Sequence, residues 1–416
     1  MNRTAVVATL AVLLVALGIA IAVLIPWTAL AGASPHVDVA RDFTPAEVAR
    51  EVACHRAIRP PAYASLLLGL VVAGLLGLTP LGARIVSGVA RPVGGGFVAQ
   101  VLLGTLALTL IGRVVTLPLD ALSERVLRRY GLSTQSWGSW LVDAAKGVGV
   151  ATVLTSVVLL AVLVLVRLAP RTWWAWGALV TAGFVVLGSF VYPLLVEPVF
   201  NSFTSLPAGQ LRSDLLAMAS RDDVPVKDVL VADASRRTTS LNAYVSGFGS
   251  TRRIVLYDTL VKTATPAEVE LIVAHELGHA KRQDVLHGTL LGALGSAAGV
   301  CALALLLSWT PLLRRAGVSS VGDPRIIPLL LFVVAFAGLL FAPATNLMSR
   351  RIEARADVHS LDVTRDVPTF IASEQRLART NLSDLEPNPL LYAMFSTHPT
   401  SPQRIALARE WARLHS

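Results

Sequence analysis

The chain has 416 residues, of which 54% are hydrophobic and only 15% are charged. Soluble proteins carry about 25% charged residues, so this composition excludes an ordinary soluble enzyme and favours a lipid environment. The formal net charge of +9 comes mostly from arginines. These arginines are spread over loops between apolar stretches, which is typical of membrane orientation and argues against a nucleic-acid partner. The two cysteines, Cys54 and Cys301, allow no disulfide framework and no cysteine-rich metal site.

Seven apolar stretches reach the roughly 20 residues that a helix needs to cross a bilayer. They lie near 5–30, 64–88, 97–119, 148–169, 173–196, 286–309 and 326–347. The first stretch could be a signal peptide, because Ala29-Leu30-Ala31 resembles a cleavage site. Its apolar run is longer than the roughly 7–15 residues of a signal peptide, so we expect an uncleaved first span. The sequence therefore predicts a multi-pass protein of the cell membrane.

In a seven-span protein, one side of the membrane carries the loops around 31–63 and 120–147, the segment 197–285 and the tail after 348. Basic residues in the short loops are evenly divided between the two sides. Further basic residues lie near span ends on the two large segments: Lys281, Arg282, Arg350, Arg351 and Arg355. The positive-inside rule therefore predicts that this side is cytoplasmic.

The two sizeable polar segments, 199–285 and 348–416, flank a hairpin of two spans and emerge on the same face. We therefore expect four parts. Residues 1–198 would contain the first five transmembrane helices and 286–347 the sixth and seventh. Residues 199–285 and 348–416 would be two parts of one polar domain.

Local patterns predict the elements of this polar domain. The stretches 228–233, 239–248 and 253–257 have the composition of strands. A helix then begins with Thr265 as its N-cap, Pro266 at its first position and Glu268 closing a capping box, and should run to about Gln283. Further helices are expected at 346–361, 368–380 and 401–414, the last with Ser401 as its cap.

The helix that begins at Pro266 carries His-Glu-Leu-Gly-His at 275–279, which is the H-E-x-x-H pattern. His275 and His279 are one turn apart on one helix face, so both imidazoles can reach one metal ion. Zinc suits two such nitrogens, and Glu276 is then placed to take a proton from the attacking water. Many soluble helices match these five letters by chance. The uncharged flanking residues and the well-marked helix start favour a real site with one Zn²⁺ per chain.

A catalytic zinc needs a third protein ligand and an open fourth position. Glu353 is the candidate, because its helix returns from the two-span hairpin to the face that carries His275. Asp357 lies one turn after Glu353 and could hold a ligating histidine by its outer nitrogen. Taken alone, the two acids suggest an ordinary charged helix face balanced by Arg350 and Arg351, and the H-E-x-x-H helix favours the ligand role. Among the other histidines, His287 and His359 lie on neither ligand face, and His36, His55 and His415 have no evident partner.

With these motifs the chain resembles the type I CAAX prenyl endopeptidases, the sterile-24-like integral-membrane zinc metalloproteases, to which the HtpX-type bacterial proteases are related. Three further segments resemble family elements in family order. They are residues 192–203 leaving the fifth span, residues 241–248 with 253–260 as a strand pair, and the His-Pro and Arg-Ile pairs at 398–405. The resemblance implies a mainly α fold, with a polytopic membrane body of about seven helices and a gluzincin-like α+β zinc protease domain carrying a small sheet. The polar domain would be this catalytic domain.

The resemblance also implies roles for further residues. Asn242, Ala243 and Tyr244 would lie on the edge strand along which an extended substrate binds, although Asn242 could be only a strand-end residue. His398 would join Glu276 as a catalytic residue by stabilising the oxyanion that develops at the scissile carbonyl. Arg404 would support that site or its local structure.

The expected function is hydrolysis of peptide bonds in peptide or membrane-protein substrates, possibly lipidated, at the lipid bilayer. Three alternatives remain. An HtpX-like protease would degrade misfolded membrane proteins. A non-catalytic membrane scaffold or transporter would close a structural zinc with a fourth protein ligand. A site-2-type intramembrane protease fits less well, because the H-E-x-x-H helix is amphipathic and lies outside the spans.

Overall fold

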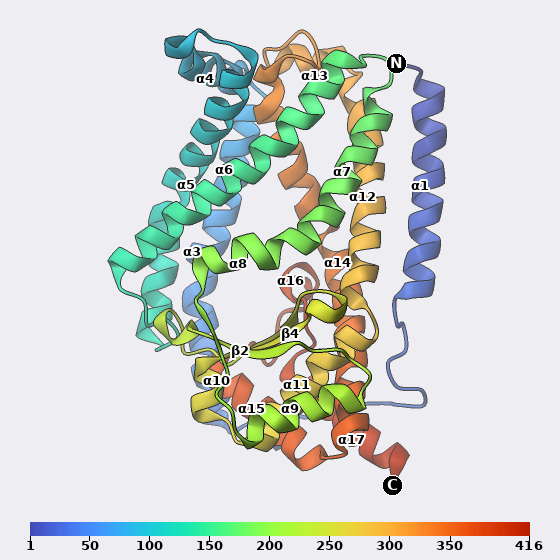
Figure 1. Ribbon diagram of the computed structural model, residues 1–416. Coiled ribbons are helices and arrows are strands. Elements are labelled where there is room, and N and C mark those ends of the chain that lie inside the picture. The colour runs from blue at the N-terminus through green and yellow to red at the C-terminus, as the bar shows by residue number, and fades with distance from the viewer.

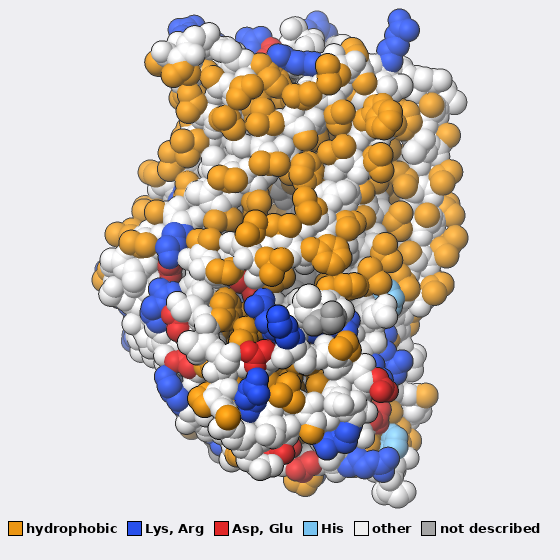
Figure 2. Space-filling view, in the orientation of Figure 1, with side chains coloured by type: hydrophobic (Ala, Val, Ile, Leu, Met, Phe, Trp, Pro, Cys, Tyr) orange, Lys and Arg blue, Asp and Glu red, His pale blue; other side chains and the backbone are white. Residues whose placement is uncertain are grey.

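The computed structural model describes all 416 residues, apart from the side chain of Ser250. Within this described chain, seven helices are long and apolar enough to cross a membrane, as predicted. They contain α1 (Arg3–Leu24), α3 (Pro45–Gly77), α5 (Phe97–Arg129), α6 (Trp137–Leu168), α7 (Trp173–Val191), α12 (Asp284–Leu307) and α14 (Ile327–Thr364). Figure 1 shows these helices in the upper part of the molecule, with the N-terminus at the top and the C-terminus at the opposite end. Hydrophobic side chains cover the upper part, while charged side chains gather over the lower end and along the top rim (Figure 2).

The second membrane helix differs from the predicted span at 64–88. Helix α3 begins at Pro45, where Thr44 and Glu47 form a capping box, and it ends at Gly77. A separate helix, α4 (Pro80–Ala90), follows with Thr79 as its cap and Pro80 at its first position. Proline is favoured at the start of a helix, so Pro80 starts α4 rather than continuing α3. Hydropathy missed this break because the residues on both sides of it are apolar.

A four-stranded sheet lies below the membrane helices, with the order β1-β2-β4-β3. Its strands are β1 (Phe203–Ser205), β2 (Asp228–Ala232), β3 (Ala243–Ser246) and β4 (Arg253–Tyr257). Strands β2 and β4 are parallel, and β1 and β3 pair antiparallel to them at the two edges. The prediction of 253–257 is confirmed and that of 228–233 is one residue too long, while 239–248 shortens to four residues. Strand β1 was not predicted, because three residues are too few to show a periodicity.

Helix α11 (Pro266–Lys281) packs against this sheet and carries the H-E-x-x-H residues. Its predicted start is confirmed, because Thr265 and Glu268 form the capping box and Pro266 occupies the first turn. Val273 and Leu277 of α11 are fully buried in the core that contains the sheet. Since residues four apart share a helix face, burial of this face turns the histidines toward the opposite side.

Shorter helices complete the fold. They are α2 (Val39–Asp42), α8 (Glu197–Phe200), α9 (Gln210–Arg221), α10 (Asp258–Thr263), α13 (Thr310–Arg315), α15 (Val367–Asn381), α16 (Pro389–Phe395) and α17 (Ser401–His415). The N-cap of α17 is Thr400 and not Ser401 as predicted, because Thr400 exchanges hydrogen bonds with Gln403. Helices α2, α8, α9, α10, α13 and α16 were not predicted.

The hairpin of α12 and α14 links the two polar segments, 199–285 and 348–416, at the lower end of the molecule in Figure 1. Gln283 adopts a left-handed conformation that ends α11 and turns the chain into α12. After the turn at the top, α14 runs unbroken for 38 residues from the membrane region into the lower end (Figure 1). There it packs along α11. The division at 198, 285 and 347 stays a prediction.

Candidate metal centre and active site

Helix α11 presents His275 and His279 on one face, and α14 brings Glu353 against them from the far end of the hairpin. The Nε2 atoms of the two histidines are 3.2 Å apart. His275 Nε2 is 3.2 Å from Oε2 of Glu353, and His279 Nε2 is 3.6 Å from Oε1 of Glu353. The structure therefore brings together the three residues that the sequence suggests as metal ligands.

The outer ring nitrogens of both histidines face buried aspartates. Nδ1 of His275 lies 2.9 Å from Oδ1 of Asp357, and Nδ1 of His279 lies 2.9 Å from Oδ2 of Asp284. A carboxylate at Nδ1 holds the proton on that nitrogen and turns the Nε2 lone pair toward a metal. Asp357 is predicted from the sequence, and Asp284 is not. Only the position of Asp284 at the start of α12, just after the turn at Gln283, could have signalled it.

These carboxylates make the centre strongly attractive to cations. Burial by itself lowers the pKa of both rings. Hydrogen bonds with Asp357 and Glu353 outweigh it and raise the pKa of His275 to about 9. Hydrogen bonds with Asp284 and Glu353 likewise raise the pKa of His279 to about 10. Positive charge is therefore stabilised at both rings, and a metal ion can supply that charge in place of the protons.

Asp357 belongs to a second buried network, formed with Arg404 and Glu374. Nε of Arg404 donates to Oδ2 of Asp357 at 2.9 Å, and its Nη1 lies 2.7 Å from Oε1 of Glu374. Although burial opposes the charge, these two carboxylates raise the pKa of Arg404. Arg404 therefore fixes the carboxylate that orients His275. Glu374 was not predicted, because the charged residues of its predicted helix do not show which face is buried.

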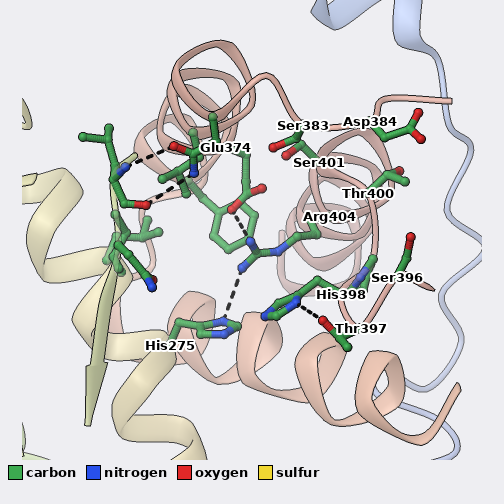
Figure 3. Close-up of a pocket in the computed structure, with 18 of the residues that line it drawn as sticks. His275, Glu374, Ser383, Asp384, Ser396, Thr397, His398, Thr400, Ser401 and Arg404 are labelled. Atoms are coloured by element: carbon green, nitrogen blue, oxygen red, sulfur yellow. Dashed lines mark hydrogen bonds and ion pairs between the residues drawn. The ribbon is translucent and has the colours of Figure 1, made fainter. Parts of the chain in front are cut away.

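A cleft of about 420 Å³ opens beside the metal ligands and is lined by Glu276 and His398. Figure 3 shows His398 reaching from the loop before α17 toward His275, with Thr397 at its Nδ1. This Nδ1 is 2.8 Å from the Thr397 hydroxyl, and Nε2 lies 3.4 Å from Oε2 of Glu353. Burial raises the pKa of Glu276, which makes its carboxylate a stronger base than an exposed one.

The edge strand β3 runs beside this cleft. Asn242, just before β3, lines the cleft together with Glu276, and Val245 of β3 lines a smaller adjoining hollow that Glu276 also borders. The Asn242 carbonyl accepts from Tyr257 N–H of β4 at 3.0 Å, so the backbone of Ala243 and Val245 faces the free edge. Ala243 N–H is bonded to the Asn242 side chain at 2.9 Å. Tyr244 faces Val255 of the neighbouring strand in the pairing register.

The donor set fits a zinc ion. Bonds of 2.0–2.1 Å in a tetrahedral site place ligand atoms about 3.3 Å apart. The two 3.2 Å separations that His275 makes, and the 3.6 Å separation of His279 from Glu353, are close to that value. Two imidazoles and one carboxylate are also the donor types of a three-ligand zinc site with an open position.

Seven helices long and apolar enough to cross a membrane, with an H-E-x-x-H helix and an acidic partner below them, are typical of the class of multi-pass membrane metalloproteases. Comparisons with known proteins agree with this class. The model of peptidase family M48 matches residues 205–412, and that of the CAAX prenyl protease N-terminal region, described as five membrane helices, matches residues 63–202. The chain belongs to peptidase family M48 and is a metalloprotease, so the predicted resemblance is confirmed.

Similar proteins include the uncharacterized metalloprotease YhfN of Bacillus subtilis, which is 31% identical over 73% of this chain and 72% of its own length. A CAAX prenyl protease 1 homolog of Arabidopsis thaliana is 29% identical over 70% and 69% of the two chains. The crystal structure of S. mikatae Ste24p covers 98% of this chain and 99% of its own, with a TM-score of 0.79 at 20% identity. This likeness shows a shared fold.

Proposed function

We propose that the protein is a zinc-dependent endopeptidase that cleaves peptide segments presented at the membrane. The observation that carries this proposal is the convergence of His275 Nε2, His279 Nε2 and Glu353 beside a cleft that Glu276 and His398 line. His275, His279 and Glu353 would hold one zinc ion. A zinc ion held there supplies Lewis acidity, which polarises the scissile carbonyl and makes water a stronger acid.

Glu276 is the general base in this proposal. Its carboxylate takes the proton of the attacking water and returns it to the leaving amine. His398, with its Nδ1 held by Thr397, directs Nε2 toward the reacting carbonyl and donates a hydrogen bond to the oxygen that becomes negative. Asp357 and Asp284 orient the ligand rings, and Arg404 positions Asp357.

The substrate would bind as an added strand along β3. Unpaired N–H and C=O groups on a sheet edge bind extended peptides without demanding a particular sequence. In the free protein the Asn242 side chain occupies Ala243 N–H, the place that a substrate carbonyl would take. Peptide binding therefore requires Asn242 to turn away. Glu276 borders both hollows beside the strand, so a bound peptide would pass over the base.

The site's place beneath the membrane helices supports a substrate that is presented at the membrane. Curated relatives are named CAAX prenyl proteases, and we propose that this chain acts on peptide or membrane-protein segments, including lipidated C-termini. Residues 199–285 and 348–416 would form one catalytic domain on the cytoplasmic side, where the basic residues near the span ends lie. An HtpX-like role would instead require cleavage of unmodified membrane proteins.

The test compares Glu276→Gln with the wild type in liposomes containing farnesylated and unmodified versions of one C-terminal peptide, with products identified by mass spectrometry. We expect wild-type cleavage to exceed cleavage by the variant by roughly 10² to 10⁴, the usual contribution of a general base, with zinc content unchanged. Glu270→Gln, on the same helix but outside the cleft lining, is the matched control and should keep activity. Retained cleavage in Glu276→Gln would show that another group is the base. Equal cleavage of both peptides would favour the HtpX-like role.

A further inference from the structure

A second cluster of metal-binding side chains, separate from His275, His279 and Glu353, lies between the start of α3 and the loop that follows α15. Glu51 and His55 are one turn apart on α3, and Asp384 comes from the loop. One donor atom from each of the three lies within 4.8 Å of the others. The expectation that His55 has no partner was wrong, because its Nε2 contacts Oε1 of Glu51 and the carbonyl oxygen of Leu382.

Within this cluster, one carboxylate oxygen of Glu51 has no protein group in the described part of the chain that donates a hydrogen bond to it. Its side chain is buried, with 4% of the residue exposed, and Oε1 has no hydrogen-bond partner among the described residues. Oε1 is directed at the cluster, 3.3 Å from Nε2 of His55. A buried carboxylate oxygen without a partner is costly, so a cation at this position would stabilise it.

A backbone carbonyl adds a fourth donor. His55 Nε2 lies 2.9 Å from the carbonyl oxygen of Leu382, which ends α15 in a left-handed conformation with φ of 47°. The 3.3 Å separation of His55 Nε2 from Glu51 Oε1 matches the spacing of about 3.3 Å between ligands of a tetrahedral zinc. The 2.9 Å separation from the Leu382 carbonyl is that of a hydrogen bond, which a bound ion would replace. Arg59 forms an ion pair with Oδ2 of Asp384, so this ion pair does not use Oδ1 of the same carboxylate.

The charges also fit a cation. Asp384 and Glu386 both act electrostatically on Glu51, and Arg59 opposes them. A cavity of about 150 Å³ lies on the other side of Glu51 and Leu382, where Glu47, Arg50 and Arg379 also line it. One imidazole with carboxylate and carbonyl oxygens suits a zinc-type transition ion better than magnesium or calcium, which bind all-oxygen sites.

We propose that Glu51, His55 and Asp384, with the carbonyl of Leu382, bind a second zinc ion that is separate from the catalytic centre. The ion would tie α3 to the loop after α15. That loop is a wall of the active-site cleft, which Asp384 itself lines. The preceding Asn381 holds the backbone of Leu241, just before the edge strand, through two hydrogen bonds. The second ion therefore fixes the part of the cleft that receives the substrate.

The test counts zinc bound to the full-length protein in detergent, after equilibrium with buffered micromolar zinc, by mass spectrometry of the metal. We expect two zinc ions in the wild type and one in each of His55→Ala, Glu51→Gln and His279→Ala. The double variant His55→Ala/His279→Ala should hold none. His36→Ala removes an exposed histidine outside both clusters and should keep two.

The single variants also report on folding, because each keeps the other site. Cobalt replacing zinc in His279→Ala gives a visible absorption band from the second site alone, which Glu51→Gln should remove. One zinc ion in both the wild type and His55→Ala would overturn the proposal. Two zinc ions in both His55→Ala and Glu51→Gln would equally overturn it.

Discussion

Asp284 and Asp222 form a natural pair for testing whether a carboxylate behind a histidine tunes a metal site. Asp284 contacts His279 at 2.9 Å and pairs with Arg355. Asp222 contacts His359 at 2.8 Å and Lys281 at 2.7 Å. Both carboxylates are largely buried between one histidine and one cation, but only the first histidine faces the metal centre.

Asp284→Asn should weaken zinc binding 10- to 100-fold, because the amide holds the Nδ1 proton of His279 less strongly and makes Nε2 a poorer ligand. This factor corresponds to about 1.4–2.7 kcal/mol of binding free energy. Asp222→Asn loses similar charge-assisted hydrogen bonds, worth about 1.5–3 kcal/mol each to stability, but it should leave zinc affinity unchanged.

The assay is competition for zinc against a chelator of known affinity, with thermal unfolding in detergent measured on the same samples. Asp284→Asn should lower both the unfolding temperature and the affinity of the His279 site, and Asp222→Asn only the temperature. Equal losses of affinity in the two variants would refute the reasoning, because the effect would then come from general destabilisation of the lower end.

Three further outcomes follow from the packing and charges. A Cβ added at Gly278 would lie 2.9 Å from the His359 ring. Gly278→Ala should therefore cost about 1–3 kcal/mol of stability by overpacking, partly offset by about 1 kcal/mol gained in helix propensity. An unchanged unfolding temperature with full activity would contradict this expectation. Asn381→Ala should raise KM by roughly 5- to 30-fold with kcat nearly unchanged, because two hydrogen bonds to Leu241 of about 1 kcal/mol each are lost. A fall in kcat alone would argue against a substrate-binding role. Burial opposes ionisation of Asp258, but hydrogen bonds outweigh it and lower its pKa from 3.8 to about 2. The stability that Asp258→Asn removes should therefore be present above pH 4 and disappear as the pH falls through about 2. Unfolding temperatures of the wild type and the variant, measured against pH, check this.

Local patterns were enough to predict the helix that carries the candidate metal ligands His275 and His279. The capping box at Thr265 and Glu268 lies within four residues, and the spacing of His275 and His279 follows from the period of a helix. Glu353 was found because a hairpin of two spans must return the chain to the same side of the membrane. These predictions needed only near neighbours and the topology of the bilayer.

The missed features depend on contacts that no local pattern encodes. Asp284 meets His279 because Gln283 takes a left-handed conformation, which its sequence does not demand. Glu374 is buried only because Arg404 comes from another helix to pair with it. His55 gains Asp384 from the other end of the chain. Tertiary packing, which brings such distant groups together, decided each of them.

The position of Glu353 is also set from within the membrane. Helix α14 runs unbroken from Ile327 to Thr364, so its register against other helices is transmitted along its length. Pro328 packs so closely on Gly82 of α4 that an added Cβ would lie 2.7 Å from the proline ring. Glu353 lies 25 residues further on, about 38 Å along a helix that rises 1.5 Å per residue. Since α14 carries both Glu353 and Asp357, a shift at the Pro328 contact would displace the third ligand and the partner of His275 together. The packing of α14 within the membrane body therefore helps to set the positions of Glu353 and Asp357 beside His275.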